Sequence, residues 1–340
     1  MQVLDRWSFS GSLVVTIPDA TRPLDPFPAL CEIAKRAPNI TNVVVGLGLH
    51  RRMDIPQKWK QDFAIIQHDP DDCIETGVVD GIQGKVHRSF GSAEASLSIG
   101  IAELHQYAGF SGGFKGVAVG CGGRETILAL HHRDRILAEG VRIGAIDNNP
   151  FREVVDKLGE NAGCQWALNY APSLDRWFFG EPKHVLQQVS SAVQPWYSLP
   201  RSVSSVLLDI PKSKGTSLYQ ASRAASYLAL SPSPPLQKNA ILCIEAKMQE
   251  GFGAEEGFVR ALRSCPYPWT QLIEEEAPTG AGAQRAVILA KVCQKYQLRL
   301  YGVDRPDIFH KVGIWATAGS APREDIDLYI PQPFQRLPQR

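Results

Sequence analysis

The segment Ser12-Leu-Val-Val-Thr-Ile17, which runs directly into Pro18-Asp-Ala-Thr-Arg-Pro23, decides the fold class of this chain. A short apolar run rich in β-branched residues is typical of a strand that is covered on both faces in a parallel sheet. Similar segments recur at 42–47, 63–67, 97–102, 164–168, 206–210, 240–245 and 298–301. Helical patterns alternate with them at 28–36, 125–139, 150–158, 182–192, 217–230, 254–264 and 280–296. This alternation predicts an α/β protein with mainly parallel sheets.

The length of 340 residues predicts two α/β domains rather than one. The segment 194–205 is rich in Pro and Ser, so we expect the linker between the domains there. After Ile330 the chain is rich in Pro and Gln and is expected to be irregular. We therefore predict an N-terminal domain over 1–200, a C-terminal α/β domain over 201–318, and a tail over 319–340 that packs back on the N-terminal domain.

Charge and composition exclude several classes of partner. The chain has 36 basic and 35 acidic residues, which leaves no electrostatic footprint for nucleic acid or for an anionic membrane. No apolar run approaches the ~18 residues that a membrane helix needs. The seven cysteines include no C-x-x-C pair, which fits a reducing compartment better than a disulfide framework. We expect a cytoplasmic protein that binds neither nucleic acid nor membrane.

Polar residues follow the first strand at its carboxyl end, where open α/β sheets bind their ligands. Arg22 in this position could hold a carboxylate through two parallel hydrogen bonds. The alternative is a helix cap formed by Asp19 or Thr21, next to an arginine on the surface. The residues alone leave both interpretations open.

A second strand, within Asn42-Val-Val-Val-Gly-Leu-Gly-Leu-His50, ends in glycines and a histidine. Glycine lets a ligand approach the backbone closely, and a histidine with a pKa near ~6.5 suits proton transfer at neutral pH. The glycines do not form a dinucleotide-binding fingerprint, because the third glycine is missing and Pro56 follows soon after. A single histidine at the end of a strand is more often structural than catalytic.

The segment 100–132 carries the densest set of candidate residues. Its glycines, among them Gly112 and Gly113, predict backbone amides that turn toward an anion such as a phosphate. Ser111 adds a hydroxyl donor and Lys115 adds a charge or a nucleophile, although the spacing is not that of a P-loop. His131 and its neighbour at 132 lie in the expected helix 125–139, and periodicity does not decide which of them faces inward.

Three motifs, in their order along the chain, resemble the lactate racemase family. They are Asp19-x-Thr-Arg-Pro23, Gly48-x-His50-Arg51 and His105-x-x-Ala-Gly-Phe-Ser-Gly-Gly-x-Lys115. The step of sixteen residues from Lys115 to His131 matches that family too. Weaker similarity continues at 146–152, 164–169 and 315–327, so the resemblance covers most of the chain.

The resemblance implies a cofactor and a role for each motif residue. Members of that family use a nickel-pincer nucleotide, a pyridinium mononucleotide whose sulfur-containing arms hold nickel. The cofactor is expected in the cleft between the domains, with its phosphate on the glycine-rich loop. The implied roles are covalent attachment for Lys115, nickel coordination for His131, acid–base catalysis for His50 and His105, active-site positions for Asp19 and Arg22, and cofactor binding for Thr21, Ser111, Gly112 and Gly113.

The chain departs from the family pattern at two positions. Leu104 stands where the family usually has proline, and Leu130 stands where asparagine commonly precedes the nickel histidine. The loss of that asparagine could change the affinity for the metal. In the family a further contact to the substrate carboxylate comes from the second domain, and Arg285 is our candidate for it.

The resemblance implies a racemase or epimerase of a small, lactate-like 2-hydroxy acid that works by hydride transfer. One imidazole takes the hydroxyl proton while the α-hydride leaves, and the other imidazole returns a proton after the 2-keto acid has reoriented. The expected partners are the substrate and the cofactor-synthesis enzymes. The alternatives are a pyridine-nucleotide oxidoreductase and a non-catalytic protein that binds the cofactor or a nucleotide. The residues identify neither the substrate nor the oligomeric state.

Overall fold

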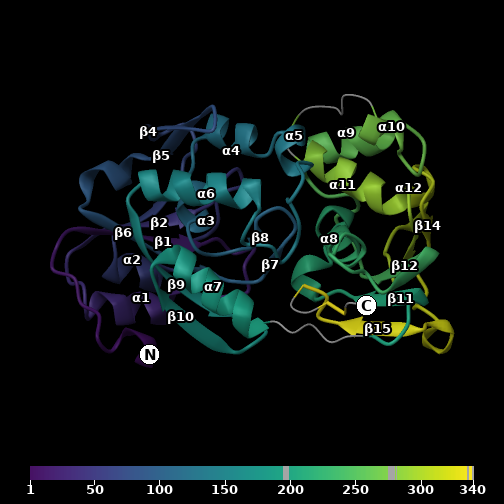
Figure 1. The fold of residues 1–340 in the computed structure, drawn as a ribbon, viewed down its shortest axis with the longest axis horizontal. Coiled ribbons are helices and arrows are strands. Elements are labelled where there is room, and N and C mark those ends of the chain that lie inside the picture. Colours follow the sequence, from purple (N-terminus) through teal and green to yellow (C-terminus); the bar gives the residue numbers. More distant parts are fainter. Residues whose placement is uncertain (194–198, 275–279, 281, 335–336, 339–340) are drawn as a thin grey trace. The chain divides into compact units, whose positions relative to one another are not determined.

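The computed structural model describes residues 1–193, 199–274, 280, 282–334 and 337–338. The chain divides into two compact units, Met1–Pro195 and Trp196–Arg340 (Figure 1). The first five residues of the predicted linker, 194–198, lie outside the described residues. Each unit has its own sheet, as expected for two α/β domains.

The first unit contains a six-stranded sheet. In spatial order its strands are β10 (Arg176–Gly180), β9 (Cys164–Ala171), β6 (Ala95–Ile101), β1 (Leu13–Pro18), β2 (Ile40–Gly46) and β3 (Ile65–Gln67). Neighbouring strands are parallel from β9 to β3, and only the edge strand β10 runs antiparallel to its neighbour. The sequence-based expectation of a mainly parallel sheet is therefore confirmed.

Both faces of this sheet are buried, because successive residues of a strand point to opposite sides. Leu13, Val15 and Ile17 of β1 lie in one core with α1 (Phe27–Ala34), whereas Val14 lies in the opposite core with Val117 of α3 (Lys115–Ala118). On the same side, α6 packs against α3 (Figure 1). The other elements of the unit are α2 (Gln57–Asp62), β4 (Cys73–Val79), β5 (Ile82–His87), β7 (Leu104–His105), β8 (Gly109–Phe110), α4 (Arg124–Leu130), α5 (Arg133–Ile136), α6 (Pro150–Asn161) and α7 (Pro182–Val193).

The single helix expected over 125–139 is wrong, because the structure has two short helices, α4 and α5, with a break at His131 and His132. His132 has non-helical backbone angles, with φ −58° and ψ 146°, and its ring Nδ1 accepts a hydrogen bond from the Asp134 amide at 3.4 Å. It therefore acts as the N-cap of α5, which starts a new helix within the apolar pattern. The break frees His131 from the middle of a helix and places it at the carboxyl end of α4.

The second unit contains a five-stranded parallel sheet. Its strands are β14 (Trp315–Ala316), β13 (Gln297–Tyr301), β12 (Leu236–Glu245), β11 (Val203–Asp209) and β15 (Leu328–Pro331). Its helices are α8 (Leu218–Ala229), α9 (Glu256–Ser264), α10 (Gln271–Glu274), α11 (Ala283–Cys293) and α12 (Pro306–His310).

The described residues after Pro331 form no helix or strand, as the composition of the tail after Ile330 predicted, but the residues just before them form a strand. Residues Leu328–Pro331 form β15 and pair in parallel with β11 of the second unit, so this part of 319–340 completes the second sheet. Ile330 is fully buried there, which explains the pairing in spite of the flanking prolines.

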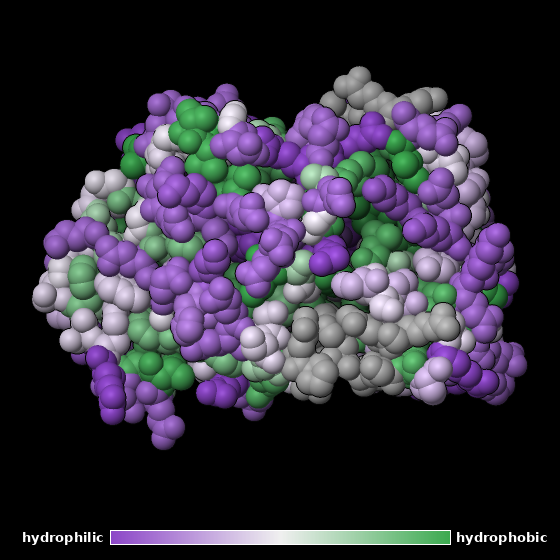
Figure 2. Space-filling view, viewed as in Figure 1, coloured by the Kyte–Doolittle hydropathy of each residue, from purple (hydrophilic) through white to green (hydrophobic). Residues whose placement is uncertain are grey.

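The surface carries hydrophobic side chains as separate patches among hydrophilic ones on the face shown in Figure 2. Within the described ranges, no helix is both long enough and apolar enough to span a bilayer.

Candidate active site

The candidate site lies where the connections of the first sheet change direction. The chain leaves β1 and reaches β2 on one side, whereas β6 pairs with β1 on the other side. In open α/β sheets such a switch point, at the carboxyl ends of the strands, is the usual place for a ligand. Asp19 follows β1, His50 follows β2, and His105 follows β6 within the short strand β7. The fold therefore brings together the loops that carry three of the expected catalytic residues.

Asp19 and His50 form a hydrogen-bonded pair. Oδ2 of Asp19 lies 2.6 Å from Nδ1 of His50, and Oδ1 accepts the hydroxyl of Thr21 at 2.6 Å. Asp19 is buried while the His50 side chain is about half exposed. Burial raises the pKa of Asp19, but His50, Thr21 and the charge of Arg22 together hold it below its ordinary value. A buried carboxylate that orients an exposed imidazole is the arrangement of a general base. Asp19 caps no helix, because the next helix, α1, begins only at Phe27.

Arg22 pairs with an acidic residue that sequence reasoning missed. Its Nη1 lies 3.6 Å from Oε1 of Glu103, a buried residue that comes shortly after β6. This pair connects the loops after β1 and β6, and it holds the guanidinium beside Asp19 rather than free in solvent. A carboxylate directly after an apolar strand was the signal that could have identified Glu103.

His105 sits at the start of a tight turn that joins β7 to β8. Its Nδ1 accepts hydrogen bonds from the amides of Tyr107 at 3.3 Å and Ala108 at 3.1 Å. The ring of Tyr107 contacts the rings of both His105 and His131, at centroid distances of 5.7 and 6.0 Å. Tyr107, which the sequence did not single out, thus lies between the proposed acid–base and the proposed metal ligand.

The glycine-rich segment is more tightly packed than an open anion cradle. Gly109 has a φ of +71°, and a Cβ there would lie 1.9 Å from the carbonyl oxygen of Ala145. Gly113 donates its amide to Oδ1 of Asn169 at 2.8 Å, and a Cβ at Gly112 would lie 2.6 Å from the same oxygen. These glycines are needed for close approach within the protein, so their density alone is weaker support for a phosphate site than it seemed from the sequence.

Ser111 contributes structure rather than an available hydroxyl. Its side chain is buried, its Oγ donates to the carbonyl of Ile101 at 2.8 Å, and it accepts the amide of Glu103 at 3.1 Å. The expected role of Ser111 as a phosphate donor is therefore not supported by its contacts. Lys115, at the start of α3, is the first helical residue after this segment.

His131 is the histidine of the His131–His132 pair that turns inward. Its ring packs between Tyr107 and Phe151, whereas the side chain of His132 is mostly exposed. Nδ1 of His131 donates to the carbonyl of Ile127 at 2.8 Å, which leaves the lone pair of Nε2 for a ligand. Burial, together with the charge of the nearby Lys115, lowers the pKa of His131 to about 4. A neutral imidazole with its second nitrogen fixed is the form that binds a metal.

The described residues fit a metal ion whose ligands come mainly from a cofactor rather than from the protein. They contain no group of three or more His, Cys, Asp or Glu side chains that could hold a metal ion. Lys115 and His131 lie close enough to interact electrostatically, and His131 offers one nitrogen. A cofactor that arrives with nickel already held by sulfur and carbon needs only such a single protein ligand.

Three other positions singled out from the sequence are buried in the structure. Leu104 and Leu130, where the chain departs from the family pattern, are completely buried, so both act as core residues. Arg285 is also buried, in the second unit, where its Nη2 lies 3.5 Å from Oγ of Ser222 and 3.4 Å from Oγ of Ser226. These contacts favour a structural role for Arg285 over the predicted role in substrate binding.

His68 follows the edge strand β3 and is buried, so its titration tests how well this part of the structure excludes water. Its Nε2 donates to the carbonyl of Gly122 at 2.9 Å, and its Nδ1 is buried without a hydrogen-bond partner among the described residues. Burial lowers the pKa of His68 to about 4. His68 therefore binds a proton less readily in the folded state than in the unfolded state. As a result, the free energy of unfolding decreases as the pH falls from about 6.5 to about 4.

We expect His68→Gln to remove this pH dependence, because glutamine can still donate to Gly122 but does not titrate. Between pH 7 and pH 4, the free energy of unfolding of the wild type should fall by ~3 kcal/mol more than that of the variant. Urea unfolding followed by circular dichroism at several pH values measures the difference. Equal losses for the two proteins would contradict the assignment.

Comparisons with known proteins show which proteins the chain is similar to. Residues 7–144 match the family described as the lactate racemase N-terminal domain. The lactate racemase of Thermoanaerobacterium thermosaccharolyticum is 26% identical over 174 residues, which are 46% of this chain and 41% of that protein. The lactate racemase of Lactiplantibacillus plantarum is 23% identical over 185 residues, 50% of this chain and 44% of that protein. The matched region thus spans less than half the length of these curated relatives.

The fold likeness extends further than the sequence similarity. The lactate racemase apoprotein from Thermoanaerobacterium thermosaccharolyticum superposes with a TM-score of 0.82 at 18% identity, covering 99% of this chain and 91% of that one. A crystal structure of a protein from Thermotoga maritima gives a TM-score of 0.72 at 16% identity, covering 98% and 94%. Both likenesses confirm the predicted α/β fold.

Proposed function

We propose that the chain racemises or epimerises a small 2-hydroxy acid such as lactate, on the ground that residues 7–144 match the lactate racemase N-terminal domain and that lactate racemases are among its relatives. One observation carries the proposal more than any other. The loop after β2 presents an imidazole oriented by a buried carboxylate, His50 with Asp19, and the turn after β6 presents a second imidazole, His105. Inversion at a carbon that bears a hydroxyl needs proton transfer on two sides of the substrate, and two histidines can provide it.

His50 is the first of these groups. The hydrogen bond between its Nδ1 and Asp19 leaves Nε2 as the nitrogen that can take the hydroxyl proton of a substrate. The low pKa of Asp19 keeps the carboxylate charged, so it stabilises the imidazolium that forms. His105 transfers the proton on the other side of the substrate. Arg22 binds the substrate carboxylate, and this bond replaces part of the contact that Arg22 makes with Glu103 in the structure.

Lys115 and His131 would hold the nickel-pincer nucleotide, Lys115 by a covalent bond and His131 through Nε2. The chemistry that this cofactor supplies when bound is reversible acceptance of the α-hydride, which interconverts the 2-hydroxy acid and the 2-keto acid. The Gly112–Gly113 turn precedes Lys115 in the chain and is held by the hydrogen bond from the Gly113 amide to Asn169. Tyr107 and Phe151 shield His131 from solvent and keep its ring in one orientation.

The test is racemisation by protein made alongside the cofactor-synthesis enzymes. With a panel of chiral 2-hydroxy acids deuterated at the α-carbon, we expect racemisation in which product keeps the deuterium, because hydride transfer shields it from water. Mass spectrometry of the product after partial turnover measures retention. Rapid exchange with solvent would point to carbanion chemistry and against the proposal.

A parallel assay separates the alternatives. If the protein were a pyridine-nucleotide oxidoreductase, the same acids would be oxidised with NAD or NADP and the absorbance of the reduced nucleotide would rise. If it only bound the cofactor, loaded protein would carry nickel and a covalent adduct but would leave every acid unchanged. We expect neither result.

A further inference from the structure

The contacts of His105 determine which of its ring nitrogens carries the proton. Nδ1 lies 3.1 Å from the amide nitrogen of Ala108 and 3.3 Å from that of Tyr107. A backbone amide can only donate, so Nδ1 must present a lone pair to both. In the neutral ring the proton then sits on Nε2, and a second proton on Nδ1 would oppose two N–H groups.

His50 has the opposite arrangement. Its Nδ1 lies 2.6 Å from a carboxylate oxygen of Asp19, which can only accept. Nδ1 of His50 therefore carries the proton, and Nε2 has the lone pair in the neutral ring. The two histidines of the site are not equivalent in the resting protein, although the proposed reaction uses both of them.

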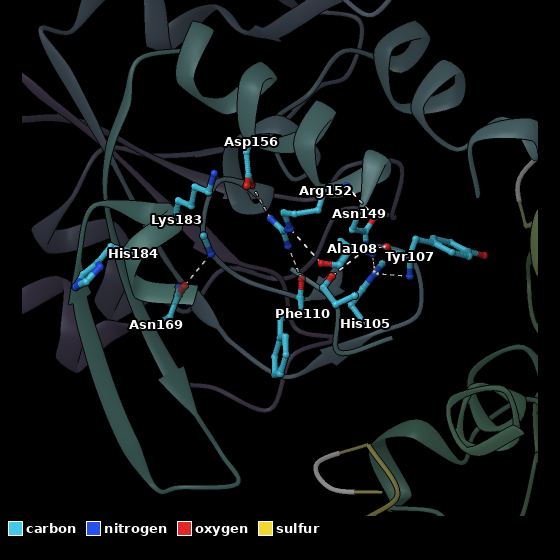
Figure 3. Close-up of polar contacts among 12 residues, drawn as sticks. His105, Tyr107, Ala108, Phe110, Asn149, Arg152, Asp156, Asn169, Lys183 and His184 are labelled. Atoms are coloured by element: carbon cyan, nitrogen blue, oxygen red, sulfur yellow. Dashed lines mark hydrogen bonds and ion pairs between the residues drawn. The ribbon is translucent and has the colours of Figure 1, made fainter. Parts of the chain in front are cut away.

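Side chains at the start of α6 donate hydrogen bonds to the turn whose amides contact His105, as Figure 3 shows. Nδ2 of Asn149 donates to the carbonyl of Tyr107 at 2.7 Å and to that of Ala145 at 2.9 Å. Nε of Arg152 donates to the carbonyl of Ala108 at 3.0 Å, and its Nη2 donates to the carbonyl of Phe110. The same two residues whose amides face His105 thus have their carbonyls fixed by α6.

Arg152 is deeply buried where it contacts the turn. The side chain is 1% exposed, and its remaining charge is balanced by Asp156 at 3.0 Å on the next turn of α6. Burying a guanidinium is costly unless its charge is paired and its donors are used, and here three of its N–H groups donate to two carbonyls and one carboxylate. The carbonyl of Tyr107 and the amide of Ala108 belong to one peptide group, so the bond from Asn149 restricts the direction in which the Ala108 amide points. Arg152 holds the next peptide group of the turn through the carbonyl of Ala108.

We propose that Asn149 and Arg152 are positioning residues that fix His105 as the Nε2–H tautomer. In the resting site Nε2 of His105 then carries the proton, whereas Nε2 of His50 carries the lone pair. Proton transfer at Nε2 of His105, in either direction, requires a proton on Nδ1, because the neutral Nε2–H ring can neither accept a second proton at Nε2 nor lose its proton without forming an imidazolate. The turn would therefore have to release the Tyr107 and Ala108 amides before His105 transfers a proton. The tautomer is inferred from the two amide contacts of Nδ1, whereas its role in catalysis rests on the proposed function.

The test uses the protein without cofactor, so it stands even if no racemase activity is found. Protein labelled with ¹⁵N only in its eight histidines gives long-range ¹⁵N–¹H spectra in which the two tautomers have different cross-peak patterns. The signals of His105 are those that disappear in His105→Gln. We expect the Nε2–H pattern at neutral pH, and an Nδ1–H or fully protonated pattern would overturn the proposal.

Two variants then test the role of α6. Asn149→Ser keeps a side chain that caps α6 at the Arg152 amide but loses both donations to carbonyls. Arg152→Met removes the guanidinium. In each folded variant we expect the single Nε2–H pattern of His105 to give way to a mixture of tautomers. Lys157→Met, which removes an exposed cation from the same helix, should leave the wild-type pattern. A wild-type pattern in Asn149→Ser, which keeps its helix cap, would overturn the positioning role.

Discussion

Replacing Lys115 by arginine is expected to abolish both the covalent adduct and the racemisation that the loaded protein catalyses. The substitution keeps a positive charge at the start of α3 and beside His131, so the electrostatic surroundings change little. A guanidinium stays protonated under all ordinary conditions and is no nucleophile, whereas an amine can lose its proton and form a covalent bond. Intact-mass spectrometry of protein made alongside the cofactor-synthesis enzymes measures the adduct directly.

Lys157→Arg is the matched control, because Lys157 is exposed on α6 and pairs only with Glu160 at 3.0 Å among the contacts described. It should keep the adduct mass, the nickel content and the activity of the wild type. Should Lys115→Arg carry the same added mass as the wild type, the attachment site lies elsewhere and the assignment of Lys115 is wrong.

Replacing His50 by glutamine is expected to reduce kcat by about 10²–10⁴-fold, the range that positioned proton transfer contributes. Glutamine keeps a polar side chain near Asp19 but takes no proton at neutral pH. His50 belongs to the loop after β2 and is not a metal ligand in the proposed site, so nickel content and adduct mass should stay at wild-type values. Steady-state racemisation together with metal analysis measures both quantities.

The control is His132→Gln, since His132 is mostly exposed and caps only the short helix α5. It should retain kcat within a few-fold of the wild type. A similar kcat for His50→Gln and wild type, at equal nickel loading, would show that the proton leaves the substrate by another group.

The hydrophobic pattern predicted most of the architecture, and its failures have physical causes. All eight predicted strands exist, because a buried parallel strand has to be apolar along its whole length. The hairpin of β4 and β5 was missed, since β4 is largely exposed and neither strand is an unbroken apolar run. Its turn, Asp80-Gly81 with positive φ at both residues, was nevertheless a recognisable hairpin signal.

Among the candidate residues, the sequence was informative where the chemistry depends on position along a strand. Asp19, His50 and His105 follow apolar strands, and the ends of parallel strands meet at one edge of the sheet. It was less informative about residues in helices. Arg285 was chosen from a local motif, but the structure buries it against Ser222 and Ser226 in the second unit.

The sequence by itself thus determined the α/β class and the strand ends that carry the site, because both follow from periodicity over a few neighbouring residues. The tertiary structure alone decided the partners: Asp19 for His50, Glu103 for Arg22, and α6 for the turn of His105. These contacts join residues that lie tens of positions apart, and hydrogen-bond geometry, burial and tautomer depend on how distant segments pack together. No local pattern records that packing.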